Sequence, residues 1–160
     1  MKTSLPFFIA AFCLLSLSAQ ARLGETPAQI EARYGKPDDK PLIIRTNEYN
    51  LNYNHAGYFI MVRFWNGKSV EEDISSDGYL DDESAKNLFK TVAGKEPSKV
   101  DKHSDSDGGS TTEFKADGVS GTFATFGGRV NCSLEVEDDA YRQHVNAILD
   151  AEKKKALDSF

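Results

Sequence analysis

The stretch GYFIMVRFWNGKSVEEDI, residues 57–74, decides the fold class because it has the pattern of a β-hairpin. Asn66 and Gly67 form a turn dipeptide between two segments, and the first segment is rich in β-branched and aromatic residues. A hairpin at the centre of the chain predicts an antiparallel sheet.

The register of this hairpin depends on its loop. A two-residue turn would set the apolar residues Ile60, Val62 and Phe64 opposite acidic and hydroxyl side chains. A three-residue loop with a bulge at the glycine would instead set them on the face of Val70 and Ile74. We predict the bulged form, because it pairs apolar side chains with each other.

Further strands are expected on both sides. Residues 41–47 form a β-branched apolar run, and residues 48–55 alternate tyrosine or leucine with asparagine. Residues 111–136 read as a meander with Asp-Gly and Gly-Gly turns. Residues 95–110 are expected to be a polar loop, and the overlapping polar segment 97–112 is the one in which an ion could bind.

Three helices complete the pattern. The first begins at Thr26 with a capping box and stops at Gly35, and the second runs from Asp81 or Asp82 to Gly94. A last helix is expected from about residue 139 to 157. The predicted class is α+β, with packed helices on antiparallel sheets, and one arrangement that fits it is two decayed α-βββ halves plus a C-terminal helix.

The first of these helices lies in LGETPAQIEARYGKP, residues 23–37. The pattern Gly24, Thr26, Gln29, Tyr34-Gly35 and Pro37 resembles a motif of the SmpA/OmlA outer-membrane lipoproteins and the β-lactamase inhibitory proteins. It looks closer still to secreted bacterial proteins that begin LGET…Q…RYG.P. The resemblance implies a helix–turn on an antiparallel sheet and a function in binding proteins, with no partner-contacting residue to transfer.

The N-terminus has the pattern of a signal peptide. Lys2 precedes an apolar run at 5–17, and Ala19 and Ala21 form an A-x-A site, so we expect cleavage after Ala21. An uncleaved anchor and a lipoprotein with Cys13 are the alternatives. The expected product is one α+β domain over residues 22–160 with no integral membrane span, secreted or periplasmic.

The net charge of the whole chain is −6. Because an acidic surface repels phosphate backbones, nucleic acid is not an expected partner. No cofactor is expected either, since no phosphate-binding loop is visible.

The cysteine and histidine residues give one enzymatic hypothesis, a small secreted hydrolase that uses Cys132 and His55. Cys132 alternates with Val130, Leu134 and Val136 on one strand face, which favours a buried core thiol. The three histidines lie in different predicted elements. The sequence therefore predicts no catalytic residue.

A calcium-binding loop is the second alternative. Asp105, Asp107 and Gly108 fit three positions of an EF-hand loop, but His103 and Phe114 stand where the first and last ligands belong. A solvated loop explains the same residues, so no metal is expected.

The central hairpin supplies the candidate docking residues. Phe59, Met61, Arg63 and Trp65 share the face opposite Ile60 and its apolar neighbours, so this strand is apolar on both faces. The C-terminal helix, with Tyr141, Val145, Ile148 and Leu149 in one stripe, is the expected cover. If it leaves the patch open, a protein partner binds there and Trp65 at the hairpin tip is its anchor.

The asparagines of residues 48–55 suggest a glycan site, although ordinary polar-out alternation explains them. The prediction is thus an exported, non-catalytic protein-binding module.

Overall fold

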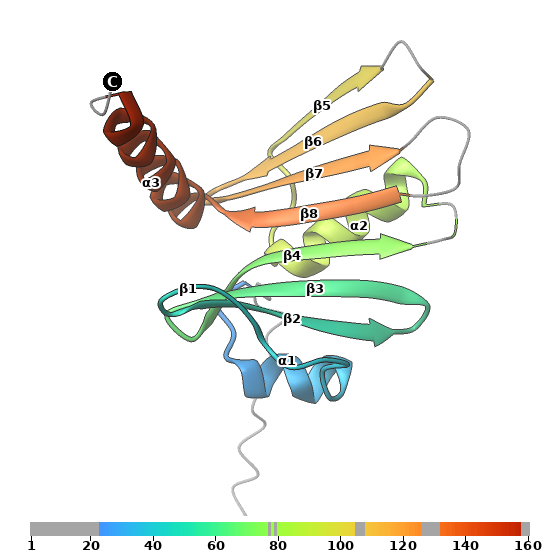
Figure 1. Ribbon diagram of the computed structural model, residues 1–160. Helices are drawn as coiled ribbons and strands as arrows, with labels where there is room; N and C mark the ends of the chain where they lie inside the picture. The colour runs from blue at the N-terminus through green and yellow to red at the C-terminus, as the bar shows by residue number, and fades with distance from the viewer. Residues whose placement is uncertain (1–22, 77, 79, 105–107, 126–131, 158–160) are drawn as a thin grey trace, which may run out of the picture.

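A computed structural model describes residues 23–76, 78, 80–104, 108–125 and 132–157 as an eight-stranded antiparallel sheet with three helices, which confirms the α+β class (Figure 1). In chain order the elements are α1 (Pro27–Tyr34), β1 (Leu42–Arg45), β2 (Glu48–His55), β3 (Tyr58–Trp65), β4 (Lys68–Ser76), α2 (Asp82–Ala93), β5 (Lys99–Ser104), β6 (Ser110–Ala116), β7 (Val119–Thr125), β8 (Cys132–Asp138) and α3 (Asp139–Leu157).

The sheet is made of two meanders that meet in its centre. The strand order is β1-β2-β3-β4-β8-β7-β6-β5. The last strands of the two meanders pair with each other, from Glu71 opposite Glu137 to Ser76 opposite Cys132. Each half has four strands where the α-βββ description expected three, and descent of the halves from one repeated unit stays a hypothesis.

One face of the sheet carries the core. α1 and α2 both contribute to it, through Ile30 and Tyr34 and through Phe89 and Val92. The strands supply the other side with alternate residues, among them Tyr53, Ile60, Val62, Phe64, Phe114, Phe123, Leu134 and Val136. Because these side chains leave water together, their burial is the main source of stability.

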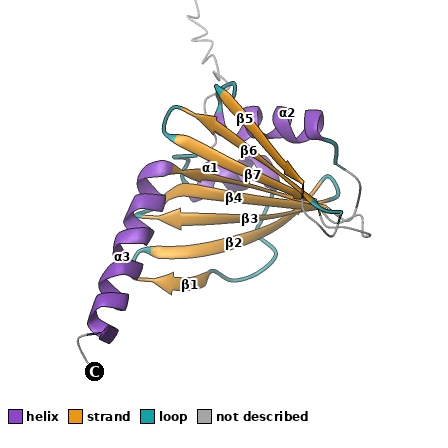
Figure 2. Cartoon of the chain, turned by 90° about the horizontal axis from the view of Figure 1, so that it is seen from above, coloured by secondary structure: helices purple, strands orange, loops and turns teal. Residues whose placement is uncertain are grey.

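α3 is placed differently from the other helices. It leaves the end of β8 and extends away from the strands, so that its C-terminal end lies clear of the sheet (Figures 1 and 2). Tyr141 in its first turn is buried, whereas Leu149 further along is half exposed.

Residues 23–37 form a structural segment that is attached to the sheet by hydrogen bonds. Gln29 Oε1 accepts a hydrogen bond from the backbone N–H of Thr26 at 2.9 Å, which caps α1 as expected. Gly24 N–H donates to the carbonyl oxygen of Ser69 at 2.7 Å, and the Tyr34 hydroxyl donates to Glu72 Oε2 at 2.8 Å. The stretch is thus tied to β4 at both of its ends.

The loop of the central hairpin differs from the prediction. Trp65 pairs with Lys68, and Asn66 and Gly67 both have positive φ, so the connection is a two-residue turn rather than a three-residue loop. The bulge lies within β4, where Val70 is the extra residue. Asn-Gly strongly favours the short turn, and the inserted residue then restores the expected Ile60–Ile74 pairing.

A second correction concerns the loop expected at residues 95–110. Lys99–Ser104 forms β5, which pairs antiparallel with β6 along its whole length. β5 is the last strand of the sheet, and its side chains are mostly exposed. An edge strand with solvent on both faces needs no apolar alternation, so its sequence looked like a loop.

Within the residues that the structure describes, no helix is long and apolar enough to span a membrane. The expected signal peptide, Cys13 and the Gly127-Gly128 turn lie outside those residues.

Gly121 offers a test of how α2 packs on the sheet. A Cβ at this position would lie 2.7 Å from Cδ2 of Phe89 and 3.1 Å from the carbonyl oxygen of Glu135. We expect Gly121→Ala to lower the free energy of unfolding by about 1–3 kcal/mol, because the ring must move. Chemical denaturation measures it.

The matched control is Thr122→Ala, whose side chain lies on the opposite face of the same strand. It should change the stability by less than roughly 0.5 kcal/mol. Equal effects of the two variants would contradict this account of the packing.

Candidate functional site

The candidate site lies on the sheet face opposite α1 and α2, which we call the open face. Phe59, Met61, Arg63 and Trp65 of β3 point to it, in alternation with the buried residues of the same strand. The expected cover, α3, reaches this face through its first turns. The ring of Trp65 stacks on His144 with centroids 4.4 Å apart and tilts against Tyr141 at 5.9 Å.

The four docking candidates are in different surroundings. Phe59 is 45% exposed, whereas Met61, Arg63 and Trp65 are half-buried. Arg63 is held by an ion pair to Glu71 at 2.8 Å and by a hydrogen bond from its Nε to Asn50 Oδ1 at 3.1 Å. These two contacts hold the guanidinium group of Arg63 in one position.

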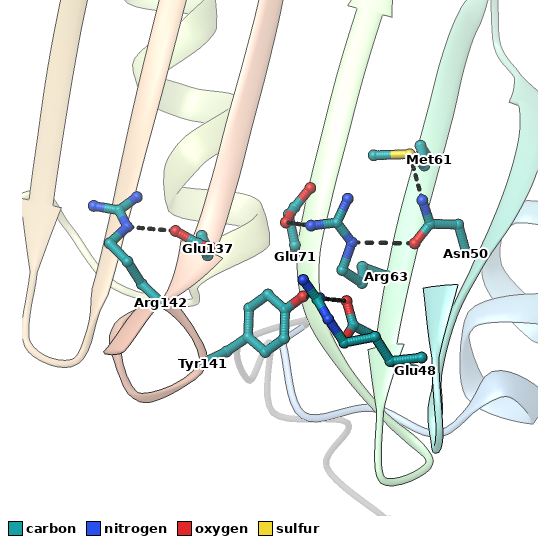
Figure 3. A network of polar contacts seen from close by, with 9 residues as sticks. Glu48, Asn50, Met61, Arg63, Glu71, Glu137, Tyr141 and Arg142 are labelled. Atoms are coloured by element: carbon teal, nitrogen blue, oxygen red, sulfur yellow. Dashed lines mark hydrogen bonds and ion pairs between the residues drawn. The ribbon is translucent and has the colours of Figure 1, made fainter. Parts of the chain in front are cut away.

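A second set of polar contacts joins the start of α3 to the edge of the open face (Figure 3). The Tyr141 hydroxyl donates to Glu48 Oε1 at 2.6 Å, and Arg45 Nη1 lies 3.1 Å from Glu48 Oε2. Burial acts to raise the pKa of Glu48, but the hydrogen bonds from Tyr141 and Arg45 outweigh it and lower the pKa. Burial and the same carboxylate raise the pKa of Tyr141 to about 12.

Carboxylates face each other where β4 meets β8. Glu71 is directly opposite Glu137, and Asp73 is directly opposite Glu135. The pKa of Glu71 is raised to about 7, because burial and the three neighbouring carboxylates raise it by more than Arg63 lowers it. Burial also raises the pKa of Asp73. Arg142 of α3 forms an ion pair with Glu137.

The structure adds Leu42 to the open face. Leu42 pairs with Asn50 across β1 and β2, and directly paired residues of antiparallel strands share a face. It is 61% exposed. Its place in an apolar run marked a strand, but nothing in the run showed that this strand is an edge.

The asparagines are less available for a glycan than their alternation suggested. Asn50 is buried and bonded to Arg63 and to Met61 Sδ, and Asn54 donates to Asp38 Oδ2 at 2.7 Å. Two of the three amides are thus engaged within the protein.

The hydrolase residues do not meet. Cys132 is 5% exposed, as the core interpretation predicted, and its Sγ lies 3.3 Å from the carbonyl oxygen of Gly78. His55 is on β2, with β3 and β4 between it and β8. Three strand spacings separate the two strands by about 14 Å, which is too far for a proton transfer.

The metal candidates Asp105 and Asp107 lie outside the described residues. Among the residues that are described, no group of three or more His, Cys, Asp or Glu side chains could hold a metal ion.

No family model and no curated protein matches the chain. One solved structure, an extracellular protein containing a SCP domain from Bacillus anthracis str. Ames, is similar over 87% of this chain and 50% of that one, with 9% identity and a TM-score of 0.47. The chain thus spans about half the length of that protein.

The carboxylate cluster predicts a pH-dependent stability. Between the ordinary pKa of a glutamate and about 7, the folded state holds a proton on Glu71 that the unfolded state has lost. Stability should therefore fall as the pH rises through this range. We expect Glu71→Gln to flatten most of that decline in melting temperature between pH 5 and 8.

Glu113→Gln is the matched control, since Glu113 lies on the same face but two strands from Glu135. It should leave the slope unchanged. An unaltered slope in Glu71→Gln would show that the cluster is not what titrates.

Proposed function

We propose that this protein is an exported, non-catalytic module of the bacterial envelope or secretome that binds a protein on its open face. The contact is centred on Phe59, Met61 and Leu42, which we call the docking patch. The observation that carries the proposal is the 45% exposure of Phe59 on a strand of the sheet interior. Phe59 and Met61 are two residues apart on the same face of β3, and adjoining apolar side chains that are open to solvent mark protein interfaces.

The surroundings of the patch suit a protein partner. Arg63 and Trp65 are enriched types at interfaces, and here both are held in place before a partner arrives. Groups that are already ordered lose little entropy on binding, so they favour affinity. We infer that they support the docking patch from its side nearest α3.

Two further points support the same function. The A-x-A pattern at Ala19–Ala21 indicates export. The resemblance of residues 23–37 to secreted and envelope proteins implies binding rather than catalysis, and the separation of Cys132 from His55 agrees with it.

Cross-linking tests the proposed surface. A photoreactive phenylalanine analogue at position 59 of the exported protein, illuminated in the native envelope and secretome, should give one dominant adduct. The same analogue at position 43 is the control. Ile43 is 68% exposed and adjacent to Leu42, but the alternation along β1 points it to the other face.

The adduct at position 59 should disappear when Leu42→Ser is added and persist when Ile43→Ser is added. Identical adducts from positions 59 and 43, or none from position 59, would remove the docking patch from consideration.

Alkylation separates the binding module from the hydrolase. In the processed chain 22–160, Cys132 is the single cysteine. Because its thiol is buried, we expect iodoacetamide to modify the native protein at neutral pH far more slowly than the same protein unfolded in guanidinium. Intact-mass measurement follows both reactions, and equal rates would favour a reactive thiol.

A further inference from the structure

The open face carries an unbalanced pair of charges next to the docking patch. Asp73 of β4 lies directly between Met61 of β3 and Glu135 of β8 in the sheet register. Like charges on directly opposed residues destabilise a sheet, so this arrangement costs free energy in the isolated protein.

The neighbouring cations are already engaged with other carboxylates. Arg63 is paired with Glu71, and Arg142 is paired with Glu137. Within the described part of the chain, neither Asp73 nor Glu135 has an ion pair, and the buried Oδ1 of Asp73 accepts no hydrogen bond. A buried carboxylate oxygen without a donor has lost its hydration and gained nothing in return.

We propose that the docking patch binds a basic segment of the partner protein, whose lysine or arginine side chain lies between Asp73 and Glu135. This inference rests on the proposed function. It assigns the chemistry of the partner: a cationic group for the two carboxylates, flanked by an apolar side chain for Met61 and Phe59. The charge of −6 over the whole chain attracts such a segment from a distance.

The groups around Asp73 and Glu135 determine the charge environment of this pair. Arg63 faces it from β3, Glu71 and Glu137 lie beside it on β4 and β8, and Arg142 faces it from α3. On the far side β7 presents Thr122, which carries no charge. Arg63 and Arg142 are thus engaged on the Glu71–Glu137 side, Lys99 and Lys115 are paired with Asp101 and Glu113, and a partner's cation completes the Asp73–Glu135 side.

The first experiment uses short peptides as probes. A peptide of alternating leucine and lysine and its counterpart with glutamate for lysine are titrated into isotope-labelled chain 22–160 and followed by NMR. The lysine peptide should shift the amides of residues 59–61, 73 and 135, and the glutamate peptide should not. The same shifts with spermidine alone would overturn the assignment to a protein segment.

The charge variant isolates the pair. Asp73→Asn with Glu135→Gln should weaken binding of the lysine peptide at least tenfold, without lowering the melting temperature, because it removes a repulsion. The control, Asp101→Asn with Glu113→Gln, makes the same change in net charge on β5 and β6 of the same face. Equal weakening by both pairs would show general attraction and overturn the inference.

The cross-link at position 59 separates this inference from the function on which it rests. Loss of the adduct in the Asp73→Asn, Glu135→Gln protein supports recognition of a basic segment. Retention of the adduct in that variant would overturn this inference and leave the docking patch standing, whereas its absence from the unmodified protein would remove both.

Discussion

The pairing of β4 with β8 is the contact on which the rest of the structure depends. It joins two four-stranded meanders into one sheet. As a result α1 and α2, which precede different meanders in the chain, bury their apolar faces in one continuous core. Without it, both strands would be edges with open rows of backbone donors and acceptors. The core face at this seam is apolar where Ile74 meets Leu134.

The same pairing determines the chemistry of the opposite face. Since direct partners share a face, joining β4 to β8 sets Glu71 against Glu137 and Asp73 against Glu135. The first pair is balanced by arginines from β3 and α3, and the second is not. The pattern of charges on the open face therefore follows from the pairing of β4 with β8.

The helix caps, the hairpin bulge and the edge strand differ in how far the sequence predicts them. The caps of α1 and α2 involve residues three or four positions apart, so Thr26 and Gln29 could be assigned correctly, and the cap of α2 was predicted as Asp81 or Asp82, of which the structure shows Asp81. The bulge at Val70 combines the two-residue Asn-Gly turn with the Ile60–Ile74 pairing, whereas the prediction placed the extra residue at Gly67. β5 pairs with β6 through its backbone, and its polar side chains do not report that pairing.

The sequence by itself determined the helices, the position of the Asn-Gly turn, the antiparallel character of the sheet and the alternation that puts Phe59, Met61, Arg63 and Trp65 on one face. All of these arise from residues close together in the chain, where spacing and backbone preferences act directly. Only the tertiary structure decided that Arg63 is held by Glu71 and Asn50, that Trp65 supports α3, and that Leu42 joins the open face. These depend on which strands become neighbours, and that choice is made by the burial of the whole core at once.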